Sequence, residues 1–280
     1  MDVGIGLPNA VSGTTGQQLV EWARRADGRG FSTLGTIDRL VYANYEPLVA
    51  LTAAAAVTER IGLTTSVLLG PLRGNPAALA KQTKSLQALS GGRFTLGIGI
   101  GGREDDLEFA GVPMSERGQR LDALLQELRD DWADERMGPA ADPPTVLVGG
   151  SVEASYKRVA KFGDGWIAGG VGPEEFAAAA EQVKAAWAEA GREGQPKLAG
   201  LGYFSLGERA EENATAYLTD YYAWLGEEVA GYIASSAAKT PEAVQGALAA
   251  FDEVGCEELI LFPCSPNPEQ VDLLADAAGL

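Results

Sequence analysis

The stretch 61–101, IGLTTSVLLGPLRGNPAALAKQTKSLQALSGGRFTLGIGIG, decides the fold of this chain. Two apolar runs, 61–69 and 94–100, flank a segment whose leucines recur at helical spacing. Asn75 and Pro76 are typical of a helix start, and the Ser-Gly-Gly that follows Leu89 is typical of a helix end. Strand, helix and strand at this spacing predict a parallel, right-handed βαβ unit.

The same alternation of apolar runs and helical segments continues along the whole chain. Eight runs have the pattern of strands: 3–7, 31–37, 61–69, 94–100, 145–148, 166–168, 198–204 and 258–262. Helical segments lie between them and after the last one. A (β/α)8 TIM barrel typically needs about 250 residues, and no linker interrupts the pattern. We therefore expect a single barrel domain over residues 1–280.

Composition restricts the partners and the compartment. The chain carries a net charge of −17, which disfavours nucleic acid and anionic membranes, so a small-molecule partner is expected. Neither a signal peptide nor a membrane span is apparent. The two cysteines, Cys256 and Cys264, form no CxxC motif, and reduced thiols in a cytoplasmic protein are the expectation.

The chain contains no histidine, which excludes histidine triads, histidine bases and histidine metal sites. Acid–base chemistry must come from carboxylate, tyrosine, lysine, cysteine or a cofactor. The acids between 104 and 108 lack the spacing of a calcium loop, so we expect a solvated loop there and no metal site.

Three groups of residues at expected strand ends are candidates for a binding site. Asp38 could accept a hydrogen bond from a cofactor or act as general acid or base, or it could simply pair with Arg39. The turn Gly149-Gly150-Ser151 could hold a phosphate at a helix N-terminus, with Gly169-Gly170 nearby, or it could be a plain turn in which Ser151 caps the helix.

Gly99 and Gly101 belong to a glycine-rich strand end that lacks a GxGxxG fingerprint. They could let a flat ligand lie against the backbone or could form a flexible loop. The aromatic residues between 217 and 232 predict core or a subunit interface, with a lid over the substrate as the alternative.

Four stretches together resemble the luciferase-like oxidoreductases, whose members use FMN or the deazaflavin coenzyme F-420. They are FSTLGTIDRL at 31–40, the segment 59–104, RGQRLDALLQELRDDW at 117–132 and LVGGSVEASYKRVAKFGDGW at 147–166. The resemblance implies a barrel that holds an isoalloxazine ring at the carboxyl ends of its strands. It also implies a non-prolyl cis peptide at Ser66-Val67 behind the ring.

The same resemblance places an acidic residue near the ring at Asp38. It places the cofactor phosphate at Gly149, Gly150 and Ser151, with Gly169 and Gly170 in the next loop. Relatives often carry histidine where this chain has Arg39. Some deazaflavin enzymes of the family bind the phosphate with hydroxyl residues where this chain has Gly169-Gly170.

The function expected from the resemblance is hydride transfer between deazaflavin coenzyme F-420 and a small organic substrate. An FMN-dependent monooxygenase that uses reduced flavin and O2 is the alternative. A non-catalytic barrel that has lost its cofactor is a second alternative, because Arg39 and the glycine pair depart from the family pattern. The alanine-rich segment 50–57 would suit a homodimer interface.

Overall fold

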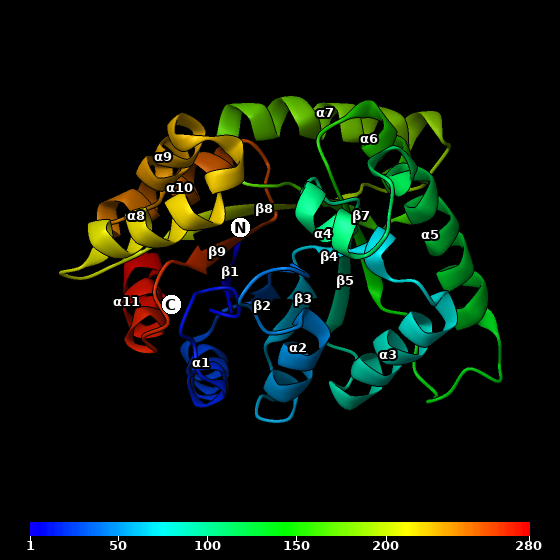
Figure 1. Ribbon diagram of the computed structural model, residues 1–280, viewed down its shortest axis with the longest axis horizontal. Coiled ribbons are helices and arrows are strands. Elements are labelled where there is room, and N and C mark those ends of the chain that lie inside the picture. The colour runs from blue at the N-terminus through cyan, green and yellow to red at the C-terminus, as the bar shows by residue number, and fades with distance from the viewer.

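The computed structural model describes residues 1–280, and their strands form one closed parallel barrel surrounded by helices (Figure 1). The strand order is β3-β2-β1-β9-β8-β7-β6-β5-β4, and a further pairing of β3 with β5 closes the ring. The strands are β1 (Asp2–Gly6), β2 (Thr33–Thr36), β3 (Gly62–Thr65), β4 (Leu68–Leu69), β5 (Phe94–Gly99), β6 (Thr145–Gly149), β7 (Gly165–Ile167), β8 (Lys197–Phe204) and β9 (Glu258–Pro263). The expected (β/α)8 barrel is confirmed.

The third position of the barrel is shared by two short strands, so nine strands occupy eight places. β3 pairs with β5 through Leu63 and Phe94, and β4 pairs with the same strand further along. Ser66 and Val67, joined by a cis peptide bond, separate the two. The apolar run 61–69 is thus divided into two strands, and the bulge with its cis peptide lies where the family resemblance implied.

Glycines on the neighbouring strands make room for the bulge. A Cβ atom at Gly97 would lie 1.9 Å from the carbonyl oxygen of Thr65, and one at Gly99 would lie 2.9 Å from Cγ2 of Val67. Gly149 on β6 faces the same side chain, with Val67 Cγ1 at 3.2 Å from its ideal Cβ position. The backbone detour after β3 therefore depends on glycine at three positions of β5 and β6.

Helices surround the barrel (Figure 1). The helices are α1 (Gly16–Arg29), α2 (Pro47–Ala55), α3 (Pro76–Leu89), α4 (Glu104–Phe109), α5 (Arg117–Ala133), α6 (Glu153–Phe162), α7 (Pro173–Glu189), α8 (Ala210–Tyr221), α9 (Glu227–Ser236), α10 (Pro241–Glu253) and α11 (Glu269–Ala278). The 3-10 turns are η1 (Gly70–Leu72), η2 (Met114–Glu116) and η3 (Ala223–Leu225). None of the helices combines the length and the apolar composition that crossing a bilayer requires.

Four helices, α1, α2, α3 and α10, begin at a residue whose side chain caps the helix. Asn75 accepts a hydrogen bond from Ala78 N–H at the start of α3, as the sequence predicts.

Both cysteines are buried and unpaired, and burial raises the pKa of each thiol to about 12. The thiols therefore stay protonated at neutral pH, which makes them poor nucleophiles.

Candidate active site

A cavity of about 330 Å³ opens at the carboxyl ends of the strands. Most of the candidate residues identified in the sequence line this cavity. They lie at the ends of different strands. Those that line it are Asp38, Ser66, Val67, Gly101, Gly149, Gly150, Ser151, Gly169 and Gly170. Gly99 does not line it, because Gly99 lies behind Val67 and gives that side chain its space. A contact between Gly99 and a ligand stays a prediction, which the cavity lining does not support.

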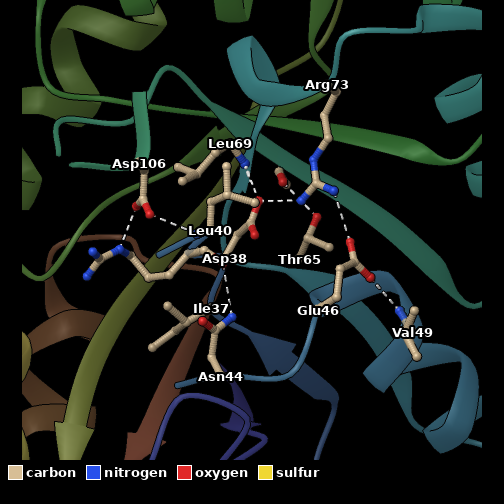
Figure 2. A network of polar contacts seen from close by, with 12 residues as sticks. Ile37, Asp38, Leu40, Asn44, Glu46, Val49, Thr65, Leu69, Arg73 and Asp106 are labelled. Carbon is tan, nitrogen blue, oxygen red and sulfur yellow. Dashed lines mark hydrogen bonds and ion pairs between the residues drawn. The ribbon is translucent and has the colours of Figure 1, made fainter. Parts of the chain in front are cut away.

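Asp38 follows β2 and is held in a polar network at the cavity wall (Figure 2). Its Oδ2 accepts hydrogen bonds from Arg73 Nη2 at 2.6 Å and from the backbone N–H of Leu69 at 2.8 Å. Arg73 also donates to Glu46 Oε1 at 3.0 Å, and Glu46 caps α2 by accepting from Val49 N–H at 2.7 Å. The carboxylate is thus fixed between β2, β4 and α2, and its Oδ1 makes no hydrogen bond.

Arg39 does not pair with Asp38, so the suggested mutual ion pair is wrong. Its Nε donates to Asp106 Oδ2 at 2.5 Å, and its Nη2 donates to Asp105 Oδ2 at 2.6 Å. The other oxygen of Asp106 accepts from the backbone N–H groups of Leu40 and Val41 at 2.9 and 2.7 Å. Arg39 therefore fixes the loop after β2 against α4.

The segment 104–108 is the first turns of α4, and the expectation of a solvated loop there was wrong. Asp106 is 1% exposed, and Leu107 beside it is also buried. Three acids fall in the first turn of this helix, where negative charge is stabilised. That placement of acids ahead of Leu107 is the signal in the sequence that indicates a short helix.

The turn after β6 has the features of an anion site. Gly150 adopts φ +126°, and a Cβ atom there would lie 2.3 Å from Ser155 Oγ. Ser155 lies in the first turn of α6, is 1% exposed, and its Oγ has no hydrogen-bond partner. Val152, and not Ser151, is the N-cap of α6, which rules out the plain-turn reading in which Ser151 caps the helix. Ser151 is exposed and free to meet a ligand.

Gly169 and Gly170 follow β7 and are exposed at the cavity mouth. A Cβ atom at Gly169 would meet nothing within 4 Å, so no contact in the protein requires glycine at that position. A more open hollow between α6 and α7 shares Ser151 and Gly169 with the cavity. The two hollows therefore adjoin each other at these residues.

Four aromatic residues, Tyr203, Tyr221, Tyr222 and Trp224, form an aromatic wall of the cavity. The hydroxyls of Tyr203 and Tyr222 lie 2.8 Å apart. Burial raises the pKa of Tyr222 to about 12 and that of Tyr203 well above its usual range. Both phenols are therefore neutral at physiological pH and act as hydrogen-bond donors and acceptors.

The sequence indicated aromatic residues in this region but not which of them line a site. Tyr217 is buried in the core, as expected for part of the cluster, and Tyr232 is 72% exposed. Arg103, which also lines the cavity, was missed altogether. It follows the glycines of β5, and position in the sequence alone does not reveal its aromatic partners.

The model of the luciferase-like monooxygenase family matches residues 1–260. The chain belongs to this family of flavin- and deazaflavin-dependent oxidoreductases. The match confirms the resemblance that the motifs of residues 31–166 carried.

Two mycobacterial relatives and one enzyme illustrate the similarity in sequence. An uncharacterised protein of Mycobacterium tuberculosis is 33% identical over 217 residues, which are 69% of this chain and 76% of that protein. A second from the same organism is 36% identical over 162 residues, 52% of this chain and 56% of the relative. An F-420-dependent glucose-6-phosphate dehydrogenase of Intrasporangium calvum is 32% identical over 190 residues, 58% of this chain and 56% of that enzyme. Apart from the first, the matched region is thus little more than half of each relative.

Solved structures share the fold over nearly the whole chain. An F-420-dependent secondary alcohol dehydrogenase, in complex with an F-420–acetone adduct, has a TM-score of 0.83 at 16% identity and covers 99% of this chain and 97% of its own. The FMN complex of the oxygenating constituent of 3,6-diketocamphane monooxygenase, a type II Baeyer–Villiger enzyme from Pseudomonas putida, has a TM-score of 0.73 at 16% identity, covering 98% and 96%. At such identities the likeness concerns the fold.

Proposed function

We propose that the protein binds a flavin-type cofactor in the cavity, with a preference for deazaflavin coenzyme F-420, and catalyses hydride transfer to or from a small organic substrate. The observation that carries the proposal is the pairing of the Ser66-Val67 bulge with the glycine turn after β6, both of which line one cavity. A flat ring needs backbone at close range, and an anionic tail needs N–H donors without partners.

The residues present fit such a group. Ser66 Oγ is buried beside the cavity without a hydrogen-bond partner, and Val67 presents its backbone and side chain to the same space. The first N–H groups of α6, with Ser155 Oγ and Ser151, would hold a phosphate. When bound, a deazaflavin supplies a two-electron hydride donor or acceptor, and the protein orients the substrate beside it.

We propose that Asp38 is the acid–base or hydrogen-bonding group of the site. Arg73 and the N–H of Leu69 occupy Oδ2 and fix the plane of the carboxylate, which leaves Oδ1 for a ligand. The chain has no histidine, and the groups at the cavity that can exchange or share a proton with a bound molecule include Asp38 and the neutral phenols of Tyr203 and Tyr222. Asp38→Asn should lower turnover about 100-fold and leave cofactor affinity unchanged.

Two kinds of relative support the preference for hydride transfer. The curated relatives include F-420-dependent glucose-6-phosphate dehydrogenases, and a solved structure of the same fold is an F-420-dependent secondary alcohol dehydrogenase. An FMN-dependent monooxygenase is the second candidate, which the FMN complex of the same fold favours. We also expect a homodimer, which sedimentation equilibrium would measure.

Titration of the purified protein with FMN and with F-420 tests the proposal. Quenching of cofactor fluorescence and a shift of the absorbance band should give micromolar dissociation constants for F-420. Micromolar binding of FMN with no binding of the deazaflavin would replace the first candidate by the second. Binding of neither cofactor, in oxidised or reduced form, would favour the non-catalytic barrel.

A further inference from the structure

Arg103 lies at the cavity between β5 and α4 and has aromatic rings as its neighbours. Its guanidinium carbon is 4.2 Å from the ring centre of Tyr221, 5.1 Å from that of Trp224 and 5.7 Å from that of Tyr222. No carboxylate lies within 4.0 Å of its nitrogens, and the side chain is only half-buried. The positive charge is therefore held over a π surface and is not neutralised.

Three carboxylates on the neighbouring helices α4 and α8 are already engaged by other groups. Asp105 and Asp106 bind Arg39, and Asp220 accepts a hydrogen bond from the Tyr42 hydroxyl at 2.6 Å. Two arginines line the cavity, and they differ in this respect: Arg39 holds two carboxylates and Arg103 holds none. The contrast marks Arg103 as the cation that is available to a ligand.

The geometry also selects the chemistry of that ligand. A guanidinium stacked on a ring keeps the N–H groups of its edge free, and those groups match a carboxylate or a phosphate in bidentate geometry. Cation–π contact offsets part of the cost of removing the charge from water, and an anion completes the pairing. More than half of the residues that line the cavity are hydrophobic, which suits an apolar body next to the anionic group.

We propose that Arg103 binds the carboxylate or phosphate of a ligand whose apolar body fills the aromatic side of the cavity. This inference rests on the proposed function, because it names the class of molecule that the proposed active site binds: one with an anionic group. The anionic group belongs either to the substrate or to the side chain of the cofactor, and the two sources give different results below.

The first experiment uses benzoate and inorganic phosphate as probes, titrated into the protein alone while tryptophan fluorescence is recorded. Trp224 is half-exposed and lies beside Arg103, so it reports an anion bound there. We expect saturable binding in the wild type, weakened at least tenfold in Arg103→Gln and by less in Arg103→Lys. Arg129→Gln is the matched control, because Arg129 also lies over a ring, that of Phe162, without a carboxylate partner, and does not line the cavity.

Two results would overturn the proposal: no saturable binding of either probe to the wild type, or the same midpoint in wild type and Arg103→Gln. Circular dichroism establishes that each variant is folded. If Arg103→Gln does not fold, Arg103→Lys decides, since its charge is kept and its planar fork is lost. Unchanged affinity in Arg103→Lys would then overturn bidentate recognition.

The second experiment finds the source of the anion by comparing FMN with riboflavin and F-420 with its neutral deazaflavin core. If Arg103 holds the cofactor side chain, Arg103→Gln weakens only the anionic member of each pair, and phosphate competes with it. If Arg103 holds the substrate, all four affinities stay unchanged and benzoate binds to the cofactor-loaded protein. Benzoate binding through Arg103 without any cofactor binding would refute the proposed function and leave this site intact.

Discussion

Asp106 Oδ2 and Arg39 Nε lie 2.5 Å apart, and their side chains are 1% and 4% exposed. This buried pair joins α4 to the loop after β2 and thereby links two walls of the cavity. Asp106 also accepts the N–H groups of Leu40 and Val41, so the carboxylate is satisfied on both oxygens. Its place in the fold is structural, at the back of a surface that ligands would meet.

Asp106→Ala should lower the free energy of unfolding by about 3–5 kcal/mol, because it leaves a buried guanidinium without its main partner. The control is Asp105→Ala, which removes the half-exposed carboxylate of the same arginine and should cost less than about 1 kcal/mol. Urea unfolding followed by circular dichroism measures both. Equal losses in the two variants would show that burial of the pair does not matter.

Gly97→Ala should destabilise the barrel by about 3 kcal/mol or prevent folding, since the new methyl group would meet the Thr65 carbonyl oxygen at 1.9 Å. The backbone of β5 is paired with strands on both sides and cannot move away from this contact. Gly74→Ala, where a Cβ atom meets nothing within 4 Å, should change the free energy of unfolding by less than about 1 kcal/mol. A wild-type melting temperature for Gly97→Ala would contradict the account of the bulge.

Gly150→Ala should weaken binding of the anionic cofactor at least tenfold, because the methyl group would collide with Ser155 Oγ and distort the turn. Riboflavin, which lacks the phosphate, should lose little affinity. Gly172→Ala serves as the control, since a Cβ atom there meets nothing within 4 Å and the residue does not line the cavity. Fluorescence quenching gives the dissociation constants, and equal loss for FMN and riboflavin would argue against a phosphate at α6.

Stability should fall as the pH rises above about 9. The pKa of each cysteine thiol is raised to about 12, and so is that of Tyr222, mainly by burial. The unfolded chain releases these protons near pH 9 for cysteine and pH 10 for tyrosine, whereas the folded protein keeps them. The contribution is complete below pH 9 and is lost towards pH 12. Urea midpoints between pH 8 and pH 11 measure the decline, which should be shallower in Tyr222→Phe; a flat profile would contradict it.

Local rules were enough to predict the elements that organise the barrel. The capping residues Asn75 and Pro76 and the apolar runs on either side of them define α3 and its two flanking strands with little dependence on distant residues. The glycines of the turn after β6 were likewise recognisable as a candidate site. These features depend on backbone conformation, which short sequence patterns encode directly.

Contacts between residues far apart in the sequence could not be predicted. Arg39 and Asp106 are 67 residues apart, so adjacency in sequence suggested the wrong partner, Asp38. The aromatic partners of Arg103 lie in the segment after β8. The sequence pattern does not show which residues of that segment meet the end of β5. The tight contact between Gly99 and Val67 arises only when the barrel closes, so the sequence did not show it.

The excursion between β8 and α10 supplies three of the four rings of the aromatic wall, whereas Asp38, the bulge and both glycine turns come from residues 38–170. Under the proposed function, the residues proposed to hold the cofactor and most of the aromatic wall therefore lie in separate parts of the gene. Exchanging residues 205–240 for the equivalent loop of a relative would change the aromatic wall while the bulge and both glycine turns are kept.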